Sequence, residues 1–240
     1  MKELAIVAII IIVIKLFPYI EMIFMGLLLL IGKIFESKEK KAQNKRIKKL
    51  KRNRVLDIGK EFEKEVEKEL QKIPEIESIF PSIILRNQSL TRFTECDFIA
   101  CSKKAIYFLE CKSYNGTVEI STEKYWKNID TKEFFYSPVR QNEGHVSFFE
   151  KNYSDIYNSN IPIYSIVIFD DRTTLIDNPT NVENSKVIKY CNLKKQIKDI
   201  EKQLITEHDM SLLQERFTLE LKDSDMYREE QIRQSMQAKS

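Results

Sequence analysis

The chain has 240 residues, with 39 Lys or Arg, 36 Asp or Glu and a formal net charge of +3. A balance this even excludes a uniformly basic nucleic-acid-binding protein. Four cysteines without a Cys-x-x-Cys pair, together with only two histidines, argue against a disulfide framework and predict no zinc site. After an apolar start, about 200 residues remain, which fits one compact domain with extensions.

The first predicted element is an apolar segment, residues 4–35, with the sequence LAIVAIIIIVIKLFPYIEMIFMGLLLLIGKIF. A membrane-spanning helix needs about 20 apolar residues, so this segment is long enough for one span. Lys15, Pro18 and Glu21 interrupt it, and membrane helices tolerate such a proline. We see no small-residue signal-peptide cleavage site. We therefore expect residues 1–35 to be a retained transmembrane anchor in contact with the lipid bilayer.

A strongly basic run follows the apolar segment. Residues 33–54 contain eleven Lys or Arg and two Glu, a local charge of +9, so the rest of the chain carries −6. By the positive-inside rule this run is cytoplasmic, which predicts a single-pass protein of the cell membrane with its soluble domain in the cytoplasm. Anionic lipid headgroups are the favoured partner of the run, and nucleic acid is the alternative. Residues 36–54 are expected to be a juxtamembrane linker.

The soluble part begins with an amphipathic helix predicted over residues 56–73 and ended by Pro74. Its apolar stripe consists of Phe62, Val66, Leu70 and Ile73. Glu63 borders this stripe. Residues 76–86 are predicted to form a strand broken near Pro81, because proline removes a backbone donor.

Strands and helices alternate through the rest of the chain. Further strands are predicted at 93–101, 105–113, 116–120, 161–170 and 186–191. Ser137 and Pro138 are typical of an N-cap and first helical residue, which predicts a helix to about Tyr157. Leu193, Ile197, Ile200 and Leu204 predict an amphipathic helix, and a second helix is expected at 209–221, followed by twenty frayed residues. This order predicts an α/β fold with a mixed central β-sheet flanked by helices.

Three of the cysteines fall within predicted strands, and the one tryptophan lies outside them. Cys96, Cys101 and Cys111 are expected to be small buried hydrophobic residues. Trp126 and its neighbour Tyr125 could stack on a nucleic-acid base, but core packing is the favoured role.

Residues 94–113, TECDFIACSKKAIYFLECKS, place charged side chains in two strands, although strands are usually poor in such residues. With Lys103 and Lys104 at the tip of a tight hairpin, Asp97 lies opposite Glu110, and Glu95 lies opposite Lys112. Directly opposed carboxylates repel each other unless a cation lies between them, and a hard divalent cation suits oxygen ligands. Lys112 would add a positive charge for a phosphate or an attacking water. The alternative is a surface ion-pair ladder of Asp97 and Glu95 with Lys112.

Three stretches then resemble a known family: GKEFEKEVEKEL, TECDFIACSKKAIYFLECKSYNG and YSPVRQNEGHVSFFEKN. Over about residues 55–170 the chain is similar to the NERD (nuclease-related) domain of the PD-(D/E)XK nuclease-like superfamily. The most specific part is the Glu-Cys-Lys stretch with Asp thirteen residues before its Glu. The resemblance implies a restriction-endonuclease-like core at 55–175, followed by a C-terminal helical extension at 176–240.

The resemblance also implies roles for individual residues. Asp97 and Glu110 would bind Mg²⁺ or Mn²⁺, and Lys112 would orient the water and stabilise charge. Glu63 would be the acid of the first helix and Gln141 the supporting glutamine of the later helix. Glu95 and His145 are candidates for positions behind these groups, with packing favoured for His145.

The function implied is that of a membrane-anchored, metal-dependent endonuclease-like protein that hydrolyses phosphodiester bonds of nucleic acid, with DNA the expected substrate in DNA processing. A catalytically inactive nucleic-acid-binding or interaction module tethered to the membrane is the alternative. A third reading is a membrane-anchored adaptor that works through its C-terminal helices.

Overall fold

The computed structural model describes residues 41, 45, 57–157, 161–176, 185–199 and 205–237. The chain divides into two compact units, residues 1–56 and 57–240. The predicted anchor (1–35) lies outside the described residues, as does the linker (36–54) except for Lys41 and Lys45, which are helical. Among the residues with a described structure, we find no helix of the length and apolarity that a membrane crossing requires.

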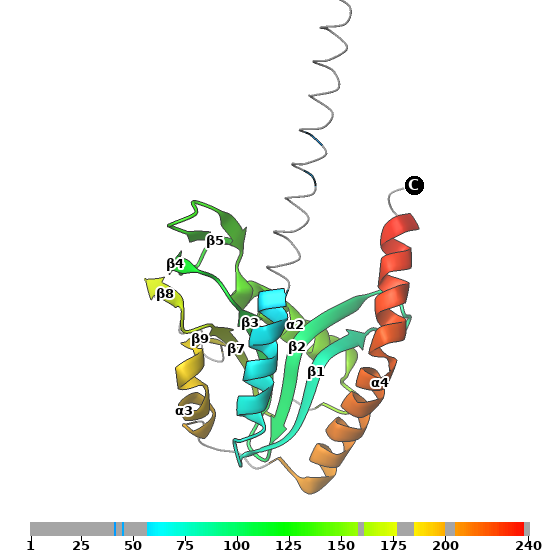
Figure 1. Ribbon diagram of the computed structural model, residues 1–240. Coiled ribbons are helices and arrows are strands. Elements are labelled where there is room, and N and C mark those ends of the chain that lie inside the picture. Colours follow the sequence, from blue (N-terminus) through cyan, green and yellow to red (C-terminus); the bar gives the residue numbers. More distant parts are fainter. Residues whose placement is uncertain are drawn as a thin grey trace, which may run out of the picture. The chain divides into compact units, whose positions relative to one another are not determined.

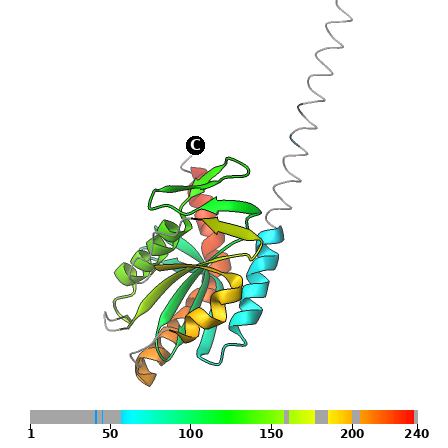
Figure 2. The ribbon, with the colours of Figure 1, turned by 90° about the vertical axis from the view of Figure 1, so that its left-hand side faces the viewer.

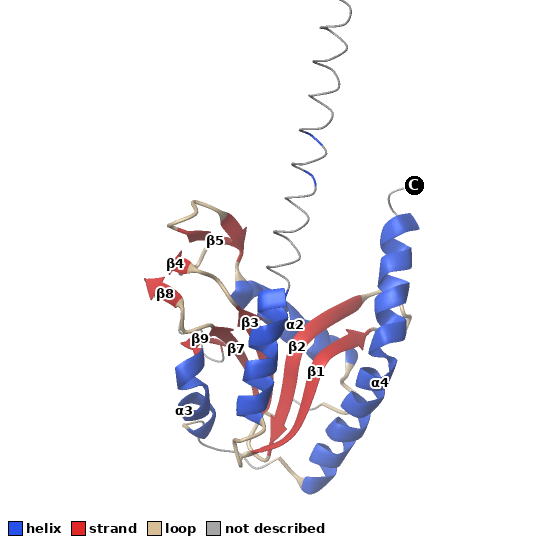
Figure 3. Cartoon of the chain, in the orientation of Figure 1, coloured by secondary structure: helices blue, strands red, loops and turns tan. Residues whose placement is uncertain are grey.

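The second unit contains two β-sheets (Figures 1 and 3). The larger has the order β1-β2-β3-β7-β9, with bounds Ile76–Arg86, Phe93–Ser102, Ile106–Lys112, Ile163–Phe169 and Ser185–Lys189. The smaller has the order β6-β5-β4-β8, with bounds Phe134–Tyr136, Tyr125–Asn128, Gly116–Glu119 and Thr173–Ile176. In the larger sheet β1, β2 and β3 pair antiparallel, whereas β3, β7 and β9 pair parallel. The predicted mixed sheet is therefore confirmed.

Helices cover both faces of the larger sheet (Figure 2). The first helix, residues 57–70, packs its predicted apolar stripe on one face, together with α3 (Leu193–Lys198). The helices α2 (Pro138–Asn152) and α4 (Glu207–Gln237) pack on the other face through residues such as Phe149 and Phe217. Side chains alternate along a strand, so Tyr107 and Leu109 join the first layer, and Ile106 and Phe108 join the second.

The predicted break of β1 near Pro81 is wrong. Pro81 pairs with Phe98, and the register is unchanged on either side, while the irregularity lies between Ile76 and Ser78. β1 is an edge strand, the kind of strand to which proline within sheets is largely confined. Ser82, the next residue, has a φ of 48°, in the left-handed region that is uncommon for residues other than glycine.

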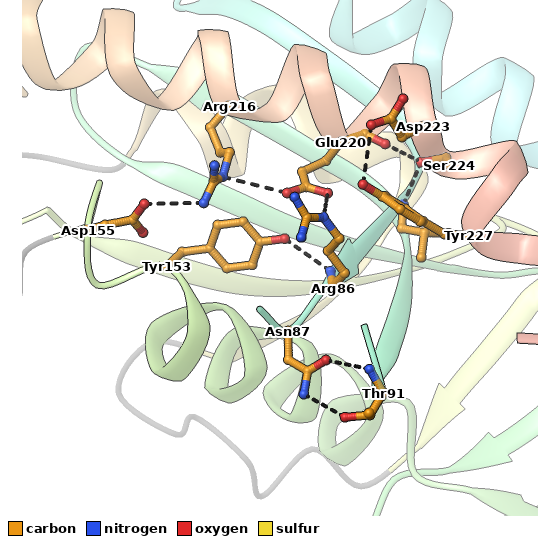
Figure 4. Close-up of polar contacts among 11 residues, drawn as sticks. Arg86, Asn87, Thr91, Tyr153, Asp155, Arg216, Glu220, Asp223, Ser224 and Tyr227 are labelled. Atoms are coloured by element: carbon orange, nitrogen blue, oxygen red, sulfur yellow. Dashed lines mark hydrogen bonds and ion pairs between the residues drawn. The ribbon is translucent and has the colours of Figure 1, made fainter. Parts of the chain in front are cut away.

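The exposed edge of β1 is covered rather than left free. The N–H of Ile84 donates to Ser224 Oγ of α4 at 2.9 Å, and the N–H of Arg86 donates to Tyr153 Oη at 3.0 Å. The buried carboxylate of Glu220 lies 3.4 Å from Arg86 Nε and 3.6 Å from Arg216 Nε. Figure 4 shows the ion pairs that join it to these two side chains. These contacts remove a free strand edge, which would otherwise pair with other chains.

The helix ends differ from the predictions in four places, the first being the helix of residues 57–70, which was predicted to continue to residue 73. Ser137 accepts the N–H of Arg140 and Pro138 begins α2, as predicted, but α2 ends at Asn152 instead of Tyr157. α3 ends at Lys198, and most of the predicted continuation to 204 lies outside the described residues. α4 begins near the predicted residue but continues to Gln237, so the prediction of frayed residues after 221 is wrong.

Tertiary contacts in the C-terminal half of α4 account for its length. The ring of Tyr227 lies 5.7 Å from that of Phe93, and Arg228 forms an ion pair with Glu95 at 2.9 Å. Tertiary contacts therefore stabilise a helix whose own sequence is polar.

Candidate active site

The candidate site lies where the pairing of β2 with β3 ends, on the side distant from their shared turn. The predicted register of this hairpin is confirmed, because Phe98, Ile99, Ala100 and Cys101 pair with Leu109, Phe108, Tyr107 and Ile106. The paired ladder stops before Asp97 and Glu110. At that point Asp97 Oδ2 accepts the backbone N–H of Cys111 at 2.8 Å, so the carboxylate lies beside β3 where the strands stop pairing.

Glu110 is the most buried acid of this group, with 1% of its surface exposed. It lies on the face of β3 that carries Phe108 and that α2 covers. Its Oε1 forms an ion pair with Lys112, and its Oε2 lies 3.6 Å from His145 Nε2. Oε2 is buried and has no hydrogen-bond partner among the described residues. A buried carboxylate oxygen in this state is costly unless a further cation or donor approaches it.

The predicted cross-strand pair of Glu95 with Lys112 does not form. Lys112 contacts Glu110 on its own strand, and Glu95 is exposed and pairs with Arg228 of α4. The surface ion-pair ladder is therefore replaced by a buried pair on β3 and a separate exposed pair between β2 and α4.

The charges of the site are strongly coupled. Burial, reinforced by the charge of Glu110, raises the pKa of Asp97 to about 7, against the opposing effects of the Cys111 N–H and Lys112. Burial also acts to raise the pKa of Glu110, but His145 and Lys112 outweigh it and hold that pKa below its usual value. Glu110 raises the pKa of Lys112 despite burial of the ammonium, so Lys112 stays charged.

Glu63 approaches from the first helix, on the other face of the sheet. Burial raises the pKa of Glu63, and the charge of Glu110 raises it further, while Lys60 and, to a smaller extent, Lys112 lower it. Glu63 is therefore within electrostatic reach of the two strand residues. The carboxylates of Glu63, Asp97 and Glu110 thus act on one another's pKa beside Lys112, a concentration of negative charge that favours a cation.

α2 reaches the site with two side chains that lie one turn apart. His145 is buried, its Nδ1 is hydrogen-bonded to Thr94 Oγ1, and its Nε2 faces Glu110, so it has a polar role in addition to packing. Asn142 is fully buried and donates to Phe108 O at 2.8 Å and to Ile166 O at 3.5 Å. Gln141 is half-buried, and its side chain makes no hydrogen bond to Asp97, Glu110 or Lys112 among the residues described.

Sequence reasoning missed Thr94 and Asn142. The signal for Asn142 was its position three residues before His145, which places both on the buried face of one helix. No comparable signal marks Thr94, because its partner lies 51 residues away. The thiols of Cys96 and Cys111 are buried and their pKa values are raised well above the ordinary value, so both remain protonated and apolar, as predicted.

A divalent cation fits this site with few protein ligands. Within the described part of the chain, no three His, Cys, Asp or Glu side chains are grouped so that they could hold a metal ion together. Mg²⁺, however, is commonly bound by one or two carboxylates, with water and substrate phosphate completing its coordination. Such an ion would stabilise Glu110 Oε2, to which no described residue donates a hydrogen bond, and the neighbouring Asp97, whose charged form is disfavoured.

The fold and site define an α/β domain with two acids and a lysine at one end of a mixed sheet. Residues 58–170 match the NERD family, described as the nuclease-related domain. The match extends from the first helix through β7 and supports the nuclease-related domain predicted from the sequence. It includes Asp97, Glu110 and Lys112 and leaves out α3 and α4. No curated protein and no solved structure matches the chain.

Proposed function

We propose that this domain hydrolyses phosphodiester bonds of nucleic acid, with DNA the expected substrate, and that it requires Mg²⁺ or Mn²⁺. The observation that carries the proposal is the pair of acids Asp97 and Glu110 beside Lys112, with one buried Glu110 oxygen that has no hydrogen-bond partner within the described part of the chain. The match to the nuclease-related domain supports the same reaction class.

Asp97 and Glu110 would hold the cation. When bound, Mg²⁺ lowers the pKa of a coordinated water and screens the charge of a phosphate. Lys112 keeps Glu110 ionised and would stabilise the negative charge that develops on the phosphate oxygens. The Cys111 N–H holds Asp97 in place, and His145 Nε2 faces Glu110 Oε2 at 3.6 Å. Glu63 would add negative charge from the first helix, and Gln141 would support the site from α2.

We further propose that the domain acts at the cytoplasmic face of the cell membrane. The apolar segment 4–35 would anchor it, and the basic run 33–54 would contact anionic headgroups or nucleic acid. The support for this part of the proposal is the sequence pattern alone.

A catalytically inactive binding module is the second candidate. The observation in its favour is the direct ion pair of Lys112 with Glu110, which occupies one oxygen of a proposed ligand. A domain in which this pair persists would retain the shape of the site without access for a cation.

The deciding experiment compares cleavage and metal binding in the 240-residue chain. The variants Asp97→Asn, Glu110→Gln and Lys112→Met should each lose most of the cleavage rate with Mg²⁺ or Mn²⁺, because groups that act as a unit are not additive. Glu150→Gln and Lys151→Met, which change exposed residues of α2, are the matched controls and should keep it. Mn²⁺ should raise the melting temperature of the wild type and leave that of Asp97→Asn unchanged. A wild-type chain that binds no divalent ion and cuts no nucleic acid would favour the binding module.

A further inference from the structure

The outer face of the smaller sheet is rich in exposed rings. The described residues leave ten large hydrophobic side chains exposed, and three of these are aromatic. All three lie on the β5–β6 hairpin: Tyr125 is 53% exposed, Phe134 is 69% exposed and Tyr136 is 43% exposed. Exposed apolar groups gathered in this way are typical of a binding surface.

The strand register places these rings on one face. Tyr125 pairs with Tyr136, and Lys127 pairs with Phe134. Between them Trp126 pairs with Phe135 and points the other way, into the core against Phe169. The outer face therefore presents three rings and a lysine that the core does not use.

Each end of this face couples a ring to an ammonium group. Lys124 Nζ lies 5.7 Å from the centre of the Tyr125 ring, and Lys127 Nζ lies 5.9 Å from the centre of the Phe134 ring. Glu123, Lys124, Tyr125 and Phe134 line an open hollow of about 560 Å³. A planar base can stack on such a ring while its phosphate meets the adjacent ammonium, and this pairing is typical of single-stranded nucleic-acid binding.

The segment that carries the rings directly follows β3 in the sequence and is therefore close to the candidate site along the chain. β4 begins at Gly116, four residues after Lys112, and between them Tyr114 stacks on Phe135 at 4.5 Å. The hairpin then leads directly into Ser137, the N-cap of α2, which carries His145. The outer face is therefore backed by rings that pack against the segment following β3.

We propose that this face, defined by Lys124, Tyr125, Lys127, Phe134 and Tyr136, binds single-stranded nucleic acid and delivers it to the site at the end of β2 and β3. The proposal rests on the proposed function and specifies its substrate class as unpaired strands. A lipid bilayer is a less suitable partner, because Glu119 lies opposite Lys127 on the same face. Base stacking can leave that carboxylate hydrated, whereas membrane insertion would desolvate it.

The test measures binding of a fluorescent oligo-dT of about 12 nucleotides to the 240-residue chain by anisotropy, in EDTA so that no cleavage occurs. The triple variant Tyr125→Ala, Phe134→Ala, Tyr136→Ala should raise the Kd at least about tenfold, because one stacked base contributes about 1–3 kcal/mol. The control variant Leu219→Ala, Met226→Ala changes exposed apolar side chains of α4 and should leave the Kd unchanged.

An abasic oligonucleotide of the same length separates stacking from attraction of the phosphates. The wild type should bind it more weakly than oligo-dT, and the triple variant should bind the two equally. The inference is overturned if the wild type binds oligo-dT and the abasic oligonucleotide with equal affinity. It is also overturned if the triple variant binds oligo-dT as tightly as the wild type does. Loss of binding to phosphatidylserine vesicles with oligo-dT affinity retained also overturns it, in favour of a membrane contact.

A second variant, Lys124→Gln, Lys127→Gln, probes the ammonium groups without removing a ring. It should reduce the slope of log affinity against log salt by about 1.4, since each phosphate contact on a single strand contributes about 0.7. Lys68→Gln, Lys222→Gln, which changes exposed lysines elsewhere, should leave the slope unchanged. Equal slopes for the first variant and the wild type would contradict the assignment.

Failure of this inference is distinguishable from failure of the proposed hydrolysis. If the chain binds oligo-dT through these rings but never cleaves it with Mg²⁺, the binding surface is supported and the proposed hydrolysis is refuted. If the chain cleaves single strands equally well with and without the three rings, the proposed hydrolysis is supported and the binding surface is refuted.

Discussion

Replacing Asp97 by Asn should change how the metal-free stability of the protein depends on pH. Burial and the nearby charge of Glu110 raise the pKa of Asp97 from 3.8 in its ordinary state to about 7 in the folded protein. The folded state therefore retains a proton that the unfolded state loses as the pH rises between these values. The free energy of unfolding falls through this window and stays low above it.

The size of the effect follows from the two pKa values. A difference of about three between them corresponds to a loss of about 4 kcal/mol in the free energy of unfolding between pH 4 and pH 8. Glu110 does not produce the same slope, because its pKa is lowered and its contribution is lost only as the pH falls below its usual value. Asn is neutral at every pH and can still accept the N–H of Cys111 through its side-chain oxygen.

Urea unfolding of the 240-residue chain in chelator, followed by fluorescence of its one tryptophan, measures this difference. Trp126 is 1% exposed in the folded protein, so its fluorescence changes when unfolding exposes the ring to water. The wild type should lose stability as the pH rises from about 4 to 8, and Asp97→Asn should be the more stable protein at the upper end. Glu150→Gln, at an exposed acid, should follow the wild type. Parallel curves for the wild type and Asp97→Asn would refute the electrostatic reasoning.

Three further predictions concern the framework of the site. Phe108→Ala should lower the free energy of unfolding by about 3–5 kcal/mol in the same urea assay, because the ring is fully buried between the sheet and α2; a loss below about 1 kcal/mol would contradict this packing. Asn142→Ala should cost about 1–3 kcal/mol, since it leaves the carbonyl of Phe108 without its side-chain donor, and Ser147→Ala on the same helix is the milder comparison. A chain that stops before α4 should aggregate in size-exclusion chromatography, because the edge of β1 and the apolar surface under Phe217 become exposed; a soluble monomer would show that α4 is dispensable.

Features that depend on neighbouring residues were predictable from the sequence. The alternation of apolar residues around Lys103 and Lys104 determined the register of β2 and β3, because side chains on a strand alternate whatever packs against them. The helical stripe of the first helix and the start of α2 at Ser137 and Pro138 follow from similarly local rules. The strands β5, β6 and β8, each of three or four residues, escaped prediction, whereas β4, which is as short, was predicted.

Features that depend on which elements pack together were decided by the tertiary structure. Pro81 lies within a continuous strand because β1 is at the edge of the sheet, and α4 extends to Gln237 because Phe93 and Glu95 meet it. The partners of the charges are the clearest case. Glu95 pairs with an arginine 133 residues away, and Lys112 turns to Glu110 on its own strand. Sequence alone placed the acids and the lysine at one end of the sheet, whereas burial and packing chose their partners, because the strength of a charge pair depends on the distance and solvent exposure that the completed fold imposes.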